Sequence, residues 1–370
     1  MLNSKLRVGR SIASGDSGAA SHRAKLTPQM LKYEEKFGIR GEIRWLPYLM
    51  YFHHPSYSSE VVNTDRLGFR ISKGAGGQAS AGGRVPKGPV RLLVGSSTAF
   101  GIGATKDEAT IASRLWSRHA TKAPWLNFAG RSHNSTQELL LFVLYRHLLP
   151  QIEEIVIFSG FNNLGLSRLP RSQQGDHGAF FNCGEYFEKM AQLRYLRHRN
   201  GSIFDRFGER RSRVTGSEDW SVPELAEQIA NAAELTVRHL EAWKLLTSAA
   251  GTKLSFVLQP MATWVRERPA PQEKLLFDEL DRIDAQGVWS PSGRSFQGMF
   301  GDISSMETRR RYSDALQNGC EILGVPFLDL NPVLAEAVGP DDWLFVDRIH
   351  FTDGGYDLVS GLLATHLNLT

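Results

Sequence analysis

Two adjacent hydroxyl side chains follow a short apolar segment in the stretch VRLLVGSSTAFGIGA, which runs from Val90 to Ala104. The apolar residues before Gly95 predict a buried strand, and the glycine permits a sharp turn at the end of that strand. Ser97 would then stand just beyond the strand, with its hydroxyl and backbone N–H exposed. This position suits a nucleophile, and Ser97 is the candidate. Ser96 is expected to shape the turn or to bond local backbone groups.

An aspartate and a histidine stand three residues apart in the segment DRIHFTDGGY, just before a helical pattern that begins near Gly354. A tight turn at this spacing can place the Asp347 carboxylate against one imidazole nitrogen of His350. The other nitrogen would face Ser97 and accept its proton, while the carboxylate fixes the tautomer and stabilises the imidazolium. The spacing alone is a weak signal, because a structural histidine and a helix-capping aspartate would share it.

Two further strand ends carry groups that could stabilise an oxyanion. Gly130, in the segment NFAGRSHNS, follows a short apolar run, and its missing side chain would let a backbone N–H approach a substrate oxygen. Asn162 and Asn163, in the segment FSGFNNL, follow the most apolar run, and an asparagine amide there can donate to developing negative charge. Taken alone, Gly130 is also what an ordinary turn would require.

Short apolar runs alternate with longer segments of helical periodicity over most of the chain. The apolar runs cover residues 90–96, 125–129, 154–160, 253–260 and 325–330, and the helical segments cover residues 107–119, 134–149, 223–249, 305–323 and 354–367. This alternation predicts βαβ units and a parallel sheet that helices cover on both faces. Such a sheet binds ligands at the carboxyl ends of its strands, so the polar groups described above are expected to meet there.

Composition divides the chain into unequal parts. Residues 1–25 are predicted to be a disordered tail, and residues 26–88 an aromatic-rich module that ends in a flexible Gly-rich linker at 74–88. Residues 89–370 are predicted to form the main domain. Within it, residues 161–222 do not follow the alternation and are interpreted as an insertion. Their arginines would suit a substrate lid, a docking face for an anionic partner, or a solvated surface segment.

The order of the polar groups resembles that of the SGNH hydrolases, also called GDSL esterases and lipases. The serine of that family's first block, Gly-Asp-Ser, falls on Ser97, and the glycine of the second block falls on Gly130. The third block, Gly-x-Asn-Asp, assigns an oxyanion amide to Asn162, and the final Asp-x-x-His falls on Asp347 and His350. The resemblance implies a three-layer α/β/α, flavodoxin-like parallel sheet with a Ser-His-Asp triad. It also implies an oxyanion hole made by the N–H groups of Ser97 and Gly130 and the Asn162 amide.

Two residues depart from the family pattern, because Ser96 and Asn163 stand where the family usually has aspartate. Neither position is one of those that carry the chemistry, so the mechanism remains possible. Both flank the oxyanion hole, so the substrate of a particular subfamily does not carry over. The upstream stretch VVNTDRLGFR resembles a segment that often precedes the catalytic domain in bacterial members, which implies that the N-terminal module borders the active site.

The sequence context argues against an alternative nucleophile, a phosphate site and a metal site. A literal Gly-Asp-Ser ends at Ser17, but no apolar strand precedes it, so nothing would hold that serine against a base. The glycines after Ser97 fit neither a GK[ST] nor a GxGxxG pattern. The histidines His53, His54 and His133 lack the spacing of metal ligands. The sequence therefore predicts neither a cofactor nor a metal.

The overall composition is that of a globular protein, and the family resemblance implies a small-molecule or glycan acyl ester as substrate. A formal net charge of +4 on 370 residues is too small to indicate nucleic-acid binding. Cys183 and Cys320 lie far apart and outside any CxxC motif, which indicates reduced thiols. No apolar run is long enough for a membrane span or for a signal-peptide core, so a cytoplasmic location is expected.

Together these patterns predict a serine esterase that hydrolyses an acyl ester, such as an O-acylated sugar or metabolite, through an acyl-enzyme. Transfer of the acyl group to a hydroxyl or an amine would use the same intermediate if the cleft excluded water. A third alternative is a non-catalytic module that binds a carbohydrate or an acylated ligand in the cleft. A binding protein, however, has no need for the full set of catalytic groups.

Overall fold

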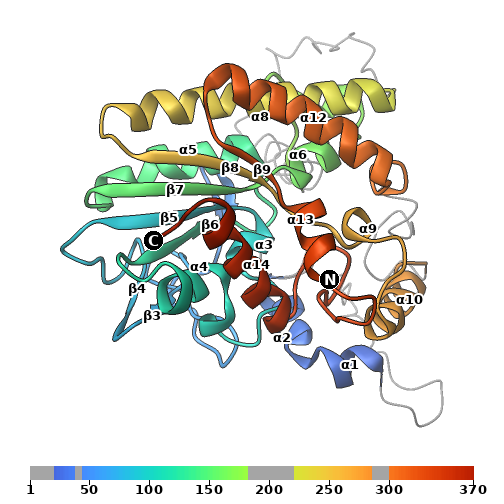
Figure 1. Ribbon diagram of the computed structural model, residues 1–370, viewed down its shortest axis with the longest axis horizontal. Coiled ribbons are helices and arrows are strands. Elements are labelled where there is room, and N and C mark those ends of the chain that lie inside the picture. Colours follow the sequence, from blue (N-terminus) through green and yellow to red (C-terminus); the bar gives the residue numbers. More distant parts are fainter. Residues whose placement is uncertain (1–20, 38–43, 182–220, 286–299) are drawn as a thin grey trace, which may run out of the picture.

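The computed structural model describes residues 21–37, 44–181, 221–285 and 300–370, and its centre is a parallel sheet (Figure 1). The sheet has five strands in the order β6-β5-β7-β8-β9. These strands are β5 (Val90–Gly95), β6 (Trp125–Ala129), β7 (Ile152–Ser159), β8 (Lys253–Leu258) and β9 (Phe327–Asp329). When β5 is counted as the first strand, the order reads 2-1-3-4-5, which is the flavodoxin-like arrangement. The predicted fold class is confirmed.

Helices cover both faces of the sheet, because every residue of β5 and β6 is buried and each face must be shielded from water. One face carries α5 (Ser135–Tyr145), α8 (Leu225–Ser248) and α12 (Met306–Leu323), and α8 packs against both of the others. The other face carries α4 (Ile111–Arg114) and α14 (Asp353–His366), which pack against each other. Figure 1 shows α8 and α12 on one side of the strands and α14 on the other.

Polar caps set where the main helices begin. Asn134 caps α5 through a capping box, Ser305 caps α12, and Thr352 caps α14. The predicted starts of these helices are therefore close to the observed ones. The helix predicted between β5 and β6 is instead broken into the 3₁₀ turn η1 (Asp107–Ala109), α4 and the π-helical turn η2 (Leu115–His119).

Shorter elements complete the described part of the chain. They are α1 (His22–Leu26), α2 (Pro28–Phe37), β1 (Arg44–Leu46), β2 (Met50–Phe52), β3 (Ser72–Gly74), β4 (Gly77–Ala79), α3 (Ser97–Phe100), η3 (Arg146–Leu148), α6 (Phe161–Leu166), η4 (Arg171–Gln173), α9 (Ala262–Val265), α10 (Pro271–Ala285) and α13 (Leu330–Ala337). The predicted insertion begins as α6, directly after β7, while its residues 182–220 lie outside the described ranges. No helix within those ranges is both long enough and apolar enough to cross a membrane.

The Gly-rich stretch at 74–88 contains regular structure, which differs from the predicted flexible linker. β3 and β4 form an antiparallel hairpin that includes the start of this stretch. Gly74 lies against Trp116, and a Cβ at this position would be 2.0 Å from the indole ring. The missing side chain of Gly74 thus permits close packing of the hairpin on the main domain.

Candidate active site

Ser97 stands where the chain leaves β5, the strand between β6 and β7 in the sheet. β5 ends at Gly95, where an added Cβ would lie 2.1 Å from the Phe158 carbonyl oxygen, so a side chain cannot be accommodated. Ser97 is the first residue of α3. Its backbone N–H has no acceptor among the residues that the structure describes. The serine therefore presents both a hydroxyl and an N–H beyond the carboxyl end of β5.

Three of the predicted residues meet at this point. The Ser97 hydroxyl lies 2.8 Å from Nε2 of His350, and Nδ1 of the same ring lies 2.7 Å from Oδ2 of Asp347. Because the carboxylate can only accept, Nδ1 carries the proton and Nε2 is left to accept from the serine. The result is a continuous hydrogen-bond chain from carboxylate to imidazole to hydroxyl, built from both ends of the main domain.

The turn before α14 holds the carboxylate of this chain in place. Oδ1 of Asp347 accepts the backbone N–H groups of Ile349 at 2.8 Å and His350 at 2.7 Å. Burial alone would raise the pKa of the Asp347 carboxyl, but the charge of His350 and these hydrogen bonds outweigh it and lower the pKa below its ordinary value. Asp347 is therefore ionised at neutral pH and fixes the tautomer of His350.

Asn162 lies at the end of the adjacent strand, near the start of α6. Its side chain is buried, and its Nδ2 donates to the His133 carbonyl at 2.7 Å. An asparagine amide has two N–H groups, so this bond leaves one of them for another acceptor. The bond also joins the end of β7 to the turn that follows β6.

The turn after β6 differs from the sequence expectation for Gly130. The Gly130 N–H donates to the Gly95 carbonyl at 3.0 Å and so continues the pairing of β6 with β5 instead of facing a cleft. A Cβ at Gly130 would lie 1.9 Å from the His133 ring, which explains the need for glycine there. Two residues later, Ser132 adopts a left-handed φ of 58°. The Ser132 N–H has no acceptor within the described ranges, so it is the available donor of this turn.

Residues of the N-terminal module form hydrogen bonds with the turn after β6. His53 accepts the Arg131 N–H through Nε2 at 2.9 Å, and the Tyr51 hydroxyl donates to the Ser132 carbonyl at 2.8 Å. Nε2 of His133 bonds the Tyr51 carbonyl at 3.1 Å. Burial lowers the pKa of His53 well below its ordinary value and that of His133 to about 4, so both rings are neutral at neutral pH. The sequence alone prompted only the question of whether these histidines bind a metal. Their role in positioning this turn was not predicted.

The two departures from the family pattern have separate environments. The Ser96 hydroxyl lies 3.3 Å from the Gln259 side chain, and not against the local backbone groups expected from the sequence. Asn163 uses both ends of its amide, because Oδ1 accepts the Ser135 N–H at 3.0 Å while Nδ2 donates to the Ser135 hydroxyl at 2.7 Å. Nδ2 also donates to Thr236 at 2.6 Å. An ionised aspartate could not make these donations.

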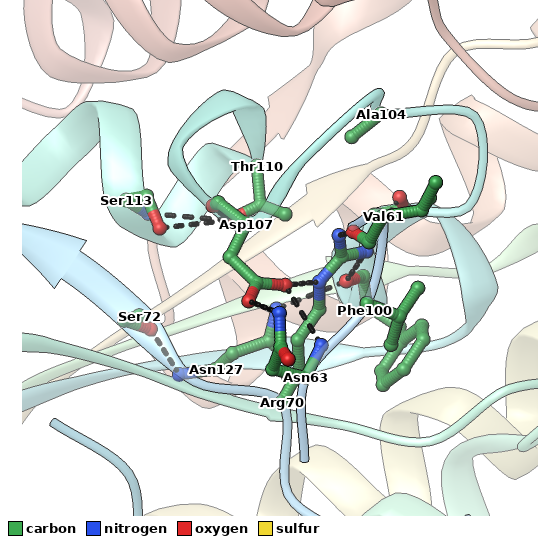
Figure 2. Close-up of polar contacts among 12 residues, drawn as sticks. Val61, Asn63, Arg70, Ser72, Phe100, Ala104, Asp107, Thr110, Ser113 and Asn127 are labelled. Atoms are coloured by element: carbon green, nitrogen blue, oxygen red, sulfur yellow. Dashed lines mark hydrogen bonds and ion pairs between the residues drawn. The ribbon is translucent and has the colours of Figure 1, made fainter. Parts of the chain in front are cut away.

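Arg70 of the N-terminal module bonds the C-terminal end of α3, the helix that begins at Ser97 (Figure 2). Arg70 is fully buried, and its Nη1 donates to the carbonyls of Gly101 at 2.8 Å and Phe100 at 3.2 Å. Its Nε donates to Asp107 at 2.9 Å, and Asn63 donates to the other oxygen of the same carboxylate at 2.8 Å. The stretch VVNTDRLGFR therefore supplies Arg70, which forms a buried ion pair with Asp107 and fixes the end of α3.

Replacing Arg70 by methionine is expected to lower the free energy of unfolding by about 3 to 5 kcal/mol, because it leaves the Asp107 carboxylate buried without its partner. Loss of the bonds to α3 should also lower kcat more than it changes KM. Urea denaturation and ester kinetics would measure the two effects. The matched control is Arg118→Met, which removes a 51% exposed arginine paired with Asp357 and should cost less than about 1 kcal/mol. Equal stability and kcat in Arg70→Met and the wild type would contradict this role.

Ser17 and Cys183 lie outside the described ranges. Cys320, the other cysteine, is a buried free thiol on α12. Burial raises the pKa of this thiol to about 12, which makes it an inert core residue.

Comparison with known protein families gives a match over most of the chain. A model of the GDSL-like lipase/acylhydrolase family matches residues 93–358. Curated proteins give no match. The chain is similar to the solved structure of a member of the lipolytic protein G-D-S-L family from Veillonella parvula, with 9% identity, a TM-score of 0.39, and 76% of this chain and 98% of that chain covered. It is also similar to the lipase/acylhydrolase from Enterococcus faecalis, with 12% identity, a TM-score of 0.38, and 75% and 95% of the two chains covered.

Proposed function

Because the chain belongs to the GDSL-like lipase/acylhydrolase family, we propose that it is a serine esterase with Ser97 as nucleophile, His350 as general base and Asp347 as its orienting partner. The Ser97 oxygen attacks the ester carbonyl carbon while Nε2 of His350 takes the hydroxyl proton. The tetrahedral intermediate then collapses as the imidazolium returns this proton to the leaving alkoxide oxygen. The products of this half-reaction are the alcohol and an acyl-serine.

Water completes the cycle by the same route. The oxygen of a water molecule attacks the acyl carbon while His350 takes a proton from that water. The second tetrahedral intermediate then releases the carboxylic acid as the imidazolium returns the proton to the Ser97 oxygen. Asp347 remains ionised throughout, in keeping with its lowered pKa, and stabilises the imidazolium in both steps.

Three N–H groups are proposed to receive the oxyanion. They are the backbone N–H of Ser97, the Nδ2 hydrogen of Asn162 that His133 does not use, and the backbone N–H of Ser132. Ser132 replaces Gly130 in this set, because the Gly130 N–H is bonded to the sheet. Each donor of this kind is worth about 10² to 10³ in rate, since it acts on charge that develops only in the transition state.

The observation that carries the proposal is the hydrogen-bond chain from Asp347 through His350 to Ser97, with distances of 2.7 and 2.8 Å. A carboxylate, a correctly protonated imidazole and a hydroxyl in series form the arrangement that activates serine nucleophiles on unrelated folds. A module that only binds ligands has no use for a base at this distance from a serine.

A fluorophosphonate probe tests the proposal directly. We expect stoichiometric covalent labelling of the folded protein, with the label found by mass spectrometry on the peptide that contains Ser97. Heat-denatured protein is the control, because a serine without its base reacts slowly with this probe. Labelling of a different serine, or none in folded protein, would count against the proposal. Free acid as the product of an aryl ester in the presence of added alcohols would then separate hydrolysis from acyl transfer.

A further inference from the structure

Arg131 leaves the sheet beside the candidate nucleophile. Gly95 of β5 pairs with Ala129 of β6, so Ser97 and Arg131 each stand two residues beyond a paired position on neighbouring parallel strands. The turn that Arg131 opens is also bonded to the amide of Asn162. Its side chain therefore starts at the same edge of the sheet as the groups proposed to react with an ester.

Among the residues that the structure describes, none supplies a counter-charge to the guanidinium of Arg131. The residue is partly buried, yet no hydrogen bond or ion pair to its side chain occurs in the part of the chain that the structure describes. Burial lowers the pKa of Arg131, and the interacting neighbour that opposes this is the Tyr51 phenol, not a carboxylate. Burial and then the Arg131 charge lower the pKa of His133, so this neighbouring imidazole is neutral and offers no negative charge.

The buried arginines of the described residues are paired with carboxylates, and the partly buried Arg44 and Arg146 donate to backbone carbonyls. Arg70 lies 2.9 Å from Asp107, and Arg309 lies 2.6 Å from Asp329. A cation that is partly withdrawn from water without such a partner is unfavourable, because it loses hydration and gains no compensating attraction. A bound anion would supply the missing attraction at Arg131.

We propose that Arg131 binds an anionic oxygen group of the ester substrate, a carboxylate or a phosphate, close to the bond that is cleaved. This inference rests on the esterase function proposed above. The planar guanidinium can donate two parallel N–H bonds to either group. The preferred substrates are therefore acyl esters that carry a negative charge, and neutral esters of the same shape are poorer substrates.

Two aryl esters of equal chain length test this preference: the 4-nitrophenyl monoester of succinic acid, which keeps a free carboxylate, and its methyl ester, which is neutral. Arg131→Gln should lower kcat/KM for the charged ester by about 30-fold or more and leave the neutral ester within about twofold. Arg131→Lys should be intermediate on the charged ester, because lysine keeps the charge without the two-pronged geometry. Competition by succinate and by inorganic phosphate at constant ionic strength would distinguish the two anion types.

Arg310→Gln is the matched control, because it removes the same charge from a 63% exposed arginine on α12 and should change neither ester. An equal loss on both esters in Arg131→Gln would overturn the proposal and assign the residue to the structure of the turn. If the wild type hydrolyses neither ester, the esterase proposal fails separately. Calorimetric binding of monomethyl succinate would then decide the anion site, which requires binding to the wild type that is lost in Arg131→Gln but not in Arg310→Gln.

Discussion

Ser97→Ala is expected to lower kcat for an activated aryl ester by about 10⁶-fold, to a rate that the remaining donors support without a nucleophile. Removal of the Ser97 hydroxyl breaks its hydrogen bond of 2.8 Å to His350. Loss of this one bond should lower the stability of the fold only slightly. Thermal melting and circular dichroism should therefore match those of the wild type while turnover disappears. Burst kinetics should also vanish, because no acyl-enzyme can form.

Ser17→Ala is the natural control for this experiment, because Ser17 closes the literal Gly-Asp-Ser of the sequence. We expect wild-type turnover from Ser17→Ala. Activity that survives in Ser97→Ala and is lost in Ser17→Ala would move the nucleophile to the N-terminal segment. Retained activity in both variants would remove the acyl-serine mechanism altogether.

The residues of the hydrogen-bond chain could be predicted because they follow local rules. Ser97 comes directly after an apolar run and a glycine, and parallel strands bring their carboxyl ends to a common edge. Asp347 and His350 are close in sequence, so one tight turn sets their geometry. The fold class was predictable for the same reason, since alternating apolar runs and helical periodicity leave few topologies.

The turn after β6 could not be predicted because long-range contacts determine it. The direction of the Gly130 N–H depends on whether the pairing of β6 with β5 continues to Gly95. Serine seldom adopts a left-handed φ, so the residue type at position 132 does not predict this conformation. His53 comes from a separate hairpin, and nothing near it in sequence indicates that it bonds this turn. The Gly-rich hairpin was missed because composition cannot distinguish a glycine that moves from one packed on Trp116.

Asp347→Asn is expected to lower kcat by about 10⁴-fold at neutral pH. The Ser97 hydroxyl, the His350 imidazole and the oxyanion donors all remain in this variant. The asparagine Nδ2 can donate to Nδ1 of His350, which would place the imidazole proton on Nε2. In that tautomer Nε2 donates and can no longer accept the proton of Ser97. Steady-state kinetics and fluorophosphonate labelling rates should fall together, because both depend on the same base.

Stability should change with pH in a defined direction in this variant. The pKa of Asp347 is lower in the folded chain than in the unfolded chain, so the ionised carboxylate stabilises the fold at neutral pH. This contribution is lost as the pH falls below about 4 and through the folded-state pKa. The destabilisation of Asp347→Asn relative to the wild type should accordingly shrink toward zero in strong acid.

The control for this pair of measurements is Asp341→Asn, because Asp341 is an exposed aspartate of the same loop and has no bond to His350. It should keep wild-type turnover and wild-type rates of fluorophosphonate labelling. If Asp347→Asn retained more than about a tenth of the wild-type kcat, the carboxylate would not be setting the tautomer of His350. The hydrogen bond between the two residues would then serve the turn before α14 instead of the reaction.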